Sequence, residues 1–300
     1  MNTKKVFVVS ESGVTWNEYK TRIAEHPALE QFFISWWVSW KKATHTIKKH
    51  IIDTVDIIIC NTPRKTGIDI MRELVNIAPE KIIYYSAWAY KHNKQWQYAL
   101  PEIAQSNLFD KKLLAWPGCF ATWSILALKP LVTSGILDQE SDIYINGVSG
   151  YSTWGKKWIK EFETKNANFI IPNSSNTHPH IAEIKSKLSI QSSINFIPKL
   201  INTYRGMYLE IHWKLNSPQA NLEDIYSSVY KDAPLINYSK DIPLLQDAQN
   251  TDLVIINGYT YQKDFVLFVA LDNLGKWSIW QTIQTLNNVL DIPEQTWLRW

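Results

Sequence analysis

One cysteine of the chain lies where a turn meets a long apolar segment. In WPGCFATWSILALKPL, Pro117 and Gly118 predict a turn, and the residues after Cys119 predict a mostly buried helix that ends before Pro130. A thiol at a helix N-terminus faces unpaired backbone N–H groups, which favour the thiolate and lower the thiol pKa. These residues leave two interpretations open, a nucleophilic Cys119 and a structural cysteine in a core. The other cysteine, Cys60, ends an apolar run and is expected in the core.

A second polar cluster lies in NTHPHIAEI, where His178, His180 and Glu183 fall within six residues at a predicted helix start. An imidazole that is oriented by a carboxylate is typical of a general base. Two histidines could instead be metal ligands, although a catalytic zinc site needs three ligands in a fitting geometry. A polar turn at the surface is the third interpretation, and these residues alone do not decide among the three.

Two glycine-containing segments could bind phosphate groups. Residues 146–158, NGVSGYSTWGKKW, contain three of the ten glycines of the chain and then Lys156 and Lys157. Backbone N–H groups and a cation in such a loop can bind phosphate, but ordinary loops often have this composition. Residues 10–16, SESGVTW, follow a predicted strand and precede a predicted helix, as a dinucleotide-binding fingerprint does. That fingerprint needs three glycines, and only Gly13 is present, so the pattern alone fails.

The elements that must position these groups follow two patterns. Before Cys119, predicted strands and helices alternate, which is typical of a parallel sheet covered on both faces. After it, several predicted strands alternate apolar and polar residues, which indicates a second α+β domain with a half-exposed sheet. A last amphipathic helix is predicted over 277–294, ending near Pro293. The predicted strands are 4–10, 31–40, 54–63, 81–87, 142–151, 195–202, 205–215 and 264–273, and the predicted helices of the first half are 15–26 and 66–80.

The composition excludes several classes of protein. Of 300 residues, 45% are hydrophobic and 20% are charged, which is typical of a soluble globular protein. The net charge of +3 is spread out, without a basic block that would favour nucleic acid or a membrane surface as a partner. The N-terminus is unlike a signal peptide, and no apolar run approaches the roughly 18–20 residues that span a bilayer. Two distant cysteines then indicate free thiols in a reducing cytoplasm.

Six motifs, taken together in their order and spacing, resemble those of N-acetyl-gamma-glutamyl-phosphate reductases in their shorter bacterial form. The motifs are WPGCFAT, YALPEI, NGVSGYSTWGKK, HPHIAEI, RGMYLEIHWKL and ALDNLGKW, and the resemblance extends from Val6 to about Pro293. It implies a doubly wound, Rossmann-like NADP-binding domain over 1–118, completed by a C-terminal helix at 275–300, and a catalytic and oligomerisation domain over 119–274. It also implies a dimer or tetramer that uses NADPH to reduce an acyl phosphate, N-acetyl-glutamyl 5-phosphate, to the semialdehyde in arginine biosynthesis.

The resemblance implies roles for the matching residues. Cys119 lies at the nucleophile position and would form a thioester, His180 would be the acid/base, and His178 and Glu183 lie at neighbouring active-site positions. Thiolate attack, proton transfer by an imidazole and hydride from a nicotinamide fit these residue types. No metal is implied. The expected substrate-binding residues are Ser149, Gly150, Lys156 and Arg205, and the expected cofactor-binding residues are Ser10, Gly13, Val14, Thr15, Lys41, Lys42, Asn273, Gly275 and Lys276.

The sequence departs from the family mainly at cofactor-facing glycines. Tryptophan replaces glycine at Trp16, Trp154, Trp277 and Trp280, and Ser10 replaces the first glycine of the cofactor loop. The last glycine of such a loop allows close helix–strand packing, so an indole at Trp16 should close the phosphate site or force the helix outward. This leaves an alternative, a catalytically impaired relative that acts as a binding or scaffold protein with a tryptophan-blocked cofactor cleft.

Two further alternatives are less well supported by the motifs. One is a related cysteine reductase such as an aspartate-semialdehyde dehydrogenase, against which HPHIAEI and YALPEI argue. The other is a metal protein built on His178 and His180.

Overall fold

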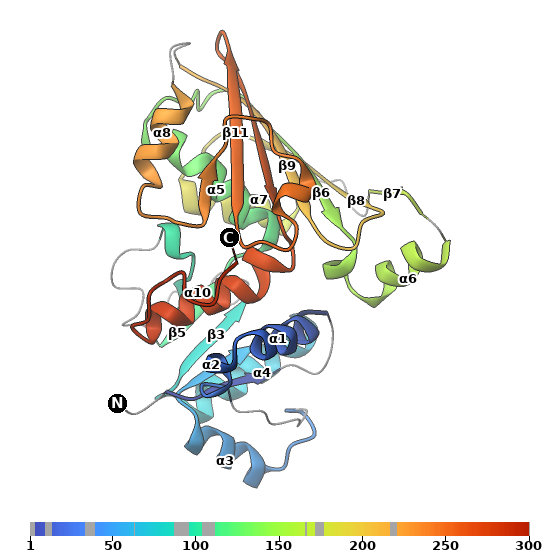
Figure 1. Cartoon of the computed structure of the whole chain (residues 1–300), viewed down its shortest axis with the longest axis vertical. Helices are drawn as coiled ribbons and strands as arrows, with labels where there is room; N and C mark the ends of the chain where they lie inside the picture. Colours follow the sequence, from blue (N-terminus) through green and yellow to red (C-terminus); the bar gives the residue numbers. More distant parts are fainter. Residues whose placement is uncertain are drawn as a thin grey trace. The chain divides into compact units, whose positions relative to one another are not determined.

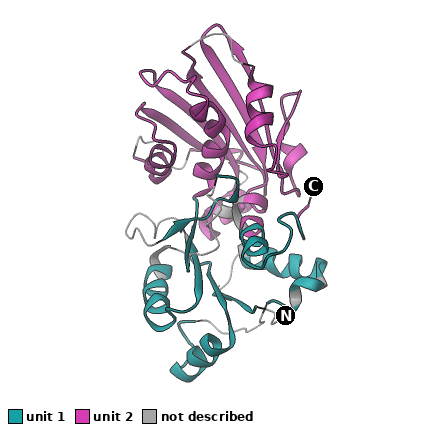
Figure 2. Cartoon of the chain, turned by 90° about the vertical axis from the view of Figure 1, so that its left-hand side faces the viewer, with its two compact units in different colours: residues 1–117, 282–297 teal, residues 118–281, 298–300 magenta. Residues whose placement is uncertain are grey.

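The chain forms two compact units, coloured separately in Figure 2. Unit 1 comprises Met1–Pro117 and Thr282–Trp297, and unit 2 comprises Gly118–Gln281 and Leu298–Trp300. The predicted functional domains, 1–118 with 275–300 and 119–274, stay a prediction. The computed structural model describes residues 4–9, 14–33, 40–62, 64–86, 96–103, 112–165, 167–171, 177–216 and 221–299.

Unit 1 is built on a sheet whose described strands run in the order β1-β2-β3-β5-β4, all paired in parallel. Every residue of β1 and β2 is buried, as continuous apolar strands must be when helices cover both faces of a sheet. This confirms the predicted doubly wound α/β fold. The strands are β1 (Val6–Val9), β2 (Ile57–Cys60), β3 (Ile82–Ser86), β4 (Gln97–Tyr98) and β5 (Leu113–Trp116).

Helices of unit 1 alternate with these strands, as the sequence predicts (Figure 1). They are α1 (Val14–Glu25), α2 (Pro27–Glu30), α3 (His45–Thr54) and α4 (Arg64–Ile77), with a short 3-10 turn at Pro101–Ile103. The predicted helix over 277–294 is a π-helical turn, Gly275–Ile279, that continues into α10 (Trp280–Val289). The predicted strand over 31–40 is not observed in its described part: Phe33 forms a single parallel bridge with Val6, and residues 31, 32 and 40 lie in turns. Residues 34–39 lie outside the described residues.

Unit 2 is built on a mixed sheet whose described strands run in the order β10-β11-β12-β9-β6-β8-β7. The strands are β6 (Ile143–Gly150), β7 (Phe169–Ile170), β8 (Ile194–Ile201), β9 (Met207–Lys214), β10 (Ile236–Tyr238), β11 (Val254–Tyr261) and β12 (Asp264–Leu271). The helices are α5 (Cys119–Thr133), α6 (Lys156–Lys165), α7 (Pro179–Leu188), α8 (Leu222–Val229) and α9 (Leu245–Ala248), with a 3-10 turn at Ser152–Trp154. Within the described residues, no helix is long and apolar enough to span a membrane.

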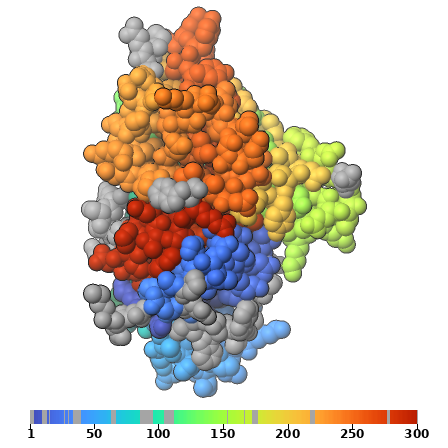
Figure 3. Space-filling model, in the orientation of Figure 1, coloured from blue at the N-terminus to red at the C-terminus, as the bar shows by residue number. Residues whose placement is uncertain are grey.

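The two faces of the unit 2 sheet differ in burial. Residues along β8 and β9 are buried alternately, and the buried face packs on α5, where Phe120 meets Phe196 with ring centroids 5.0 Å apart. The opposite face, called the open face below, keeps Tyr144 53% and Ile197 39% exposed. The β11–β12 hairpin, orange in Figure 3, reaches the surface at its tip, where Tyr261 is exposed. This alternation is what the sequence predicts for a half-exposed sheet.

Helix α5 continues through Pro130 to Thr133, so the prediction that it ends before this proline was wrong. Proline has no N–H to donate to the carbonyl of Leu126, four residues earlier. Instead, the hydroxyl of Tyr230, which follows α8, donates a 2.6 Å hydrogen bond to this carbonyl. The lost helical hydrogen bond is therefore replaced by a partner that lies 104 residues away in the sequence.

Candidate active site

Cys119 is the first residue of α5, and Gly118 caps the helix with extended backbone angles of −69° and 153°. Such angles are open to any residue, so the glycine is not needed for its backbone freedom. It is needed for space, because a Cβ on Gly118 would lie 2.3 Å from Nε2 of His180. The His180 imidazole therefore lies directly against the residue that precedes Cys119.

Helix α7 supplies the other polar groups of this cluster. His178 is its N-cap and accepts a 3.3 Å hydrogen bond at Nδ1 from the backbone N–H of His180, and the two rings lie 4.6 Å apart. One turn later, buried Glu183 accepts a 3.0 Å hydrogen bond at Oε1 from the backbone N–H of Gly118. The first turns of α5 and α7 thus bring together the four predicted catalytic residues, Cys119, His178, His180 and Glu183.

Aromatic packing holds the histidine-bearing turn on the sheet. Phe120 lies 6.2 Å from His180 and 5.0 Å from Phe196 between ring centroids, and His178 lies 4.9 Å from Phe196. Gly147 in β6 makes room for this layer, since a Cβ there would lie 2.4 Å from the Phe120 ring. Two glycines, in β6 and before α5, therefore set where the imidazoles can lie.

The electrostatics of Cys119 differ from the sequence prediction. Desolvation by burial raises the pKa of the Cys119 thiol to about 12, and the charge of Glu183 raises it further. Backbone N–H groups at the helix start, including that of Phe120, act in the predicted direction and lower this pKa. The prediction of a net lowering was wrong because desolvation outweighs these groups. At neutral pH the thiol is therefore protonated, and its attack on a substrate requires a base.

A second cluster surrounds the loop between β8 and β9. Gly206 has φ of +109°, which favours glycine, and its carbonyl accepts a 2.8 Å hydrogen bond from the backbone N–H of Gly150. Gly150 must also be glycine, because a Cβ would lie 2.8 Å from the carbonyl oxygen of Tyr204. Ser149 is buried and donates a 2.9 Å hydrogen bond to the Gly150 carbonyl. The end of β6 therefore holds the backbone of this loop in place.

Arg205 of the same loop is bound to the end of β12. Its Nε donates a 2.6 Å hydrogen bond to Oδ2 of the fully buried Asp272. The next residue, Asn273, accepts a 2.6 Å hydrogen bond from the Gly206 N–H and donates one of 2.9 Å to Oγ of Ser152. Sequence reasoning missed Asp272 and Ser152, although Asp272 lies within the ALDNLGKW motif and adjoins a predicted site residue.

The predicted substrate and cofactor residues in unit 2 fall into buried and exposed positions. Asn273 and Lys276 are fully buried, and a Cβ on Gly275 would lie 2.7 Å from the carbonyl oxygen of Thr251. Lys156 is exposed at the start of α6. The substrate and cofactor roles of these residues stay predictions.

In unit 1, the described residues fit a nucleotide phosphate. α1 begins at Val14 shortly after β1, carries no acidic side chain in its first turn, and points its helix N-terminus to where a dinucleotide phosphate binds in such folds. Lys41 and Lys42 are exposed in the turn before α3, as a site for the 2′-phosphate requires. Ser10 and Gly13 lie outside the described residues, as does the side chain of Thr15.

The four tryptophans at positions where the resemblance predicts glycine do not share one environment. Trp16 is half-buried and packs on Tyr19 of the same helix, with ring centroids 6.4 Å apart. Trp280 is fully buried, and Trp154 is half-buried at the end of a 3-10 turn. The side chain of Trp277 lies outside the description.

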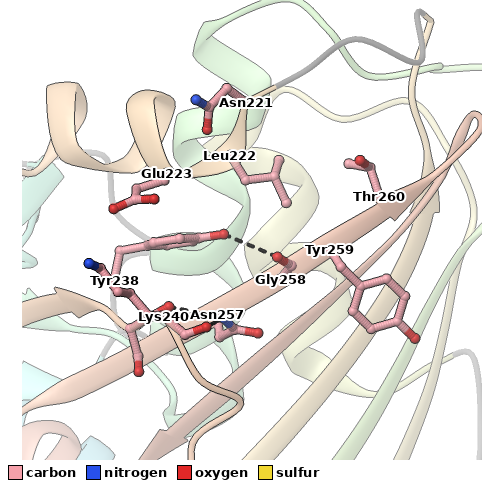
Figure 4. A pocket seen from close by; sticks show the side chains of 10 residues that line it. Asn221, Leu222, Glu223, Tyr238, Lys240, Asn257, Gly258, Tyr259 and Thr260 are labelled. Atoms are coloured by element: carbon pink, nitrogen blue, oxygen red, sulfur yellow. Dashed lines mark hydrogen bonds between the residues drawn. The ribbon is translucent and has the colours of Figure 1, made fainter.

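Among the described residues, neither a metal site nor a groove adds a residue to the candidate active site. Within the described ranges, no three His, Cys, Asp or Glu side chains are placed to hold a metal ion. A groove of about 300 Å³ between α8 and β10–β11 contains none of the predicted site residues, and there Tyr238 donates a 3.2 Å hydrogen bond to the Gly258 carbonyl (Figure 4).

Comparisons with known proteins identify the family of the chain. The family model described as semialdehyde dehydrogenase, dimerisation domain, matches residues 119–273. N-acetyl-gamma-glutamyl-phosphate reductase 2 of Nostoc sp. is 28% identical over 98% of this chain and 99% of its own length. The resemblance predicted from the six motifs is thereby confirmed.

Solved structures share the fold at low sequence identity. Aspartate semialdehyde dehydrogenase II of Vibrio cholerae, complexed with ASA, aligns with a TM-score of 0.75 and 13% identity over 97% of this chain and 99% of that chain. Aspartate semialdehyde dehydrogenase of Candida albicans, with NADP, aligns with a TM-score of 0.67 and 13% identity over 97% and 100%. The fold of both units is therefore one that is found in solved structures of aspartate semialdehyde dehydrogenases.

Proposed function

Because the chain belongs to the semialdehyde dehydrogenase family through its dimerisation domain, we propose that it is an NADP-dependent reductase of N-acetyl-glutamyl 5-phosphate in arginine biosynthesis. The observation that carries the proposal is the position of His180, whose Nε2 lies against Gly118, the residue that precedes Cys119 at the start of α5. A half-buried, protonated thiol close to an imidazole can become a nucleophile by proton transfer. The product of the proposed reaction is the semialdehyde.

The first half of the proposed reaction forms a thioester. His180 takes the proton from the Cys119 thiol as sulfur attacks the acyl carbon, and the bond between this carbon and the phosphate oxygen breaks. Inorganic phosphate leaves, and the acyl group remains on sulfur. Glu183 and His178 position the two helix starts through the hydrogen bonds to Gly118 and to the backbone of His180.

The second half releases the aldehyde. NADPH, when bound, supplies the hydride that reduces the thioester carbonyl carbon. The carbon–sulfur bond then breaks, and the imidazolium of His180 returns its proton to the Cys119 sulfur, which restores the thiol. The N-terminus of α1 with Lys41 and Lys42 would hold the cofactor phosphates, while Arg205, Ser149 and Lys156 would bind the substrate.

The proposed assembly is a homo-oligomer that uses the open face of the unit 2 sheet. The residues that match a dimerisation domain contain this sheet, and its open face exposes Tyr144, Ile197 and Tyr259. Exposed apolar side chains on a sheet face are stabilised when a second copy covers them. We place the enzyme in the cytoplasm, a proposal that two free cysteines support.

The scaffold alternative is not favoured. The relatives that match nearly the whole chain are reductases by name, and the four predicted catalytic residues are close together in this chain. The aspartate-semialdehyde alternative differs in substrate, and the assay below separates it.

The test is reduction of N-acetyl-glutamyl 5-phosphate by the purified protein, followed by the loss of NADPH absorbance. We expect turnover with this substrate, and much slower turnover with aspartyl phosphate. Cys119→Ser should abolish turnover while quenching of tryptophan fluorescence by NADPH stays unchanged, because the thiol is needed for chemistry and not for cofactor binding. Turnover by Cys119→Ser would refute the thioester mechanism, and faster reduction of aspartyl phosphate would refute the proposed substrate.

A further inference from the structure

We propose that Asp272 and Asn273, at the end of β12, are positioning residues that hold Arg205 in place to bind an anionic group of the substrate. The inference rests on the proposed function, in which the substrate carries a phosphate and a carboxylate. It assigns a role to Asp272, and it gives Asn273 a role in place of direct cofactor binding. The two residues act on the substrate through Arg205 and Gly206.

The environment of Asp272 is that of a fixed anchor. Its carboxylate is fully buried, and besides the Arg205 Nε it accepts hydrogen bonds from the backbone N–H of Asn250 at 2.7 Å and of Leu274 at 2.8 Å. A buried carboxylate requires such compensation, and a cation alone seldom provides it. With three donors around it, the carboxylate cannot follow Arg205 if the loop moves. The fixed carboxylate of Asp272 therefore sets the position of the Arg205 side chain.

The atom that Asp272 binds decides how the guanidinium is oriented. Nε lies at the side of the guanidinium, whereas the terminal Nη pair forms the fork that binds a phosphate or carboxylate in bidentate fashion. The Arg205 side chain is 19% exposed while its Nη2 atom is buried, so an anion reaches only the exposed part of the guanidinium at the surface of unit 2. A bond at Nε fixes the plane of the group, and this plane sets the direction of the fork.

The backbone of the loop is held from the same side. Asn273 bonds the N–H of Gly206, whose positive φ makes the turn after Arg205, and Gln249 donates a 2.5 Å hydrogen bond to the carbonyl of Arg205. Side chain and backbone of Arg205 are thus both tied to neighbours outside its own loop. A loop restrained at this many points loses little further entropy when an anion binds.

Strand β6 also connects the Arg205 loop to the residue that follows Cys119. Gly150 at the end of this strand bonds Gly206, and Gly147 of the same strand packs on Phe120, which follows Cys119. Gly150 lies three positions after Gly147 along the strand, a distance of about 10 Å. The strand therefore links the backbone of the Arg205 loop to the aromatic residues that pack beside Cys119.

The test measures anion binding by calorimetry with two probes, inorganic phosphate and N-acetylglutamate. The proteins are the wild type, Asp272→Asn, Arg205→Gln and the double variant, with Asp264→Asn at the exposed start of β12 as a matched control. We expect Asp272→Asn to weaken binding of one probe roughly 10-fold or more, as for loss of a hydrogen bond to a charged group. The probe that responds identifies which anionic group Arg205 binds. The control should bind both probes like the wild type.

A double-mutant cycle separates positioning from general damage. If Asp272 acts through Arg205, Asp272→Asn will have no further effect in the Arg205→Gln background. In turnover, Asp272→Asn should raise KM about as much as it raises the Kd of the probe, with kcat less affected. If Asp272→Asn does not fold, as judged by circular dichroism, Asn273→Ser provides the same test through Gly206.

Each result decides the inference. Wild-type affinity for both probes in Asp272→Asn, or equal weakening with and without Arg205, would overturn it, as would a wild type that binds neither probe. A wild type that binds a probe through Arg205 and Asp272 but does not reduce the acyl phosphate would support the inference and overturn the proposed function.

Discussion

The glycine that precedes Cys119 provides a direct test of the active-site geometry through Gly118→Ala. Its backbone angles of −69° and 153° suit alanine, so the substitution adds only a methyl group. That methyl carbon would lie 2.3 Å from Nε2, 2.6 Å from Cδ2 and 3.1 Å from Cε1 of His180. The substitution therefore acts on the imidazole and not on the backbone.

The size of the effect follows from these distances. The ring must move by about 1 Å before its contact with the methyl group reaches an ordinary 3.4 Å. A misplacement of about 1 Å at a reacting group can lower a rate by roughly 100-fold, which corresponds to about 2.7 kcal/mol of activation free energy. Forced packing should also lower the free energy of unfolding by about 1–3 kcal/mol. We therefore expect kcat to fall roughly 100-fold while the protein remains folded.

The assay compares Gly118→Ala with Gly258→Ala in kcat and in urea unfolding. A Cβ at Gly258 would lie 2.5 Å from Leu267, a comparable clash in β11, which is three strands from β6 in the sheet. Gly258→Ala should therefore lose similar stability but keep most of its kcat. Wild-type kcat in Gly118→Ala would refute the placement of His180, and equal losses of kcat in both variants would show that destabilisation alone is responsible.

Three further predictions concern stability, pH and assembly. Tyr230→Phe removes the hydroxyl that binds the Leu126 carbonyl and should lower the free energy of unfolding by about 1–3 kcal/mol in urea, so an unchanged midpoint would contradict this role. Burial raises the pKa of both Cys60 and Cys119 to about 12, so stability from the neutral thiols is fully present below about pH 8.5 and is lost as the pH rises toward 12. The rate at which iodoacetamide labels the native protein should accordingly rise about tenfold per pH unit above pH 8. A labelling rate that stops rising below pH 9 would be inconsistent with these pKa values. Ile197→Lys on the open face should halve the mass of a dimer in light scattering, and an undiminished mass would exclude this part of the face from the interface.

The positions of most elements could be predicted from the sequence because their signals are local. The apolar runs of β1 and β2 and the alternation along β8 and β9 each lie within one strand, and the Pro-Gly turn marks the start of α5. The parallel sheet follows from strands and helices in alternation. The cluster at His178 and Cys119 was also predicted, but on resemblance, since the residues alone left several interpretations open.

Other features depend on partners that are distant in the sequence. Helix α5 continues past Pro130 because the Tyr230 hydroxyl replaces the missing hydrogen bond. The residues next to the proline in the sequence do not indicate this. β11 was not predicted, because VIINGYTY has a glycine at its centre and gains its place by pairing along its whole length with β12.

For the site, the sequence by itself determined which groups are available: one thiol at a helix start, an imidazole pair with a carboxylate, and an arginine before a glycine. The tertiary structure decided the pKa of the thiol and the partner of the arginine. Desolvation reversed the predicted shift of the Cys119 pKa, because burial depends on every element packed around the sulfur. Arg205 and Asp272 are 67 residues apart, and only the folded sheet brings them within 2.6 Å. Residue types and local periodicity can be read from neighbouring positions of the sequence, whereas burial and long-range contacts exist only after the chain has folded.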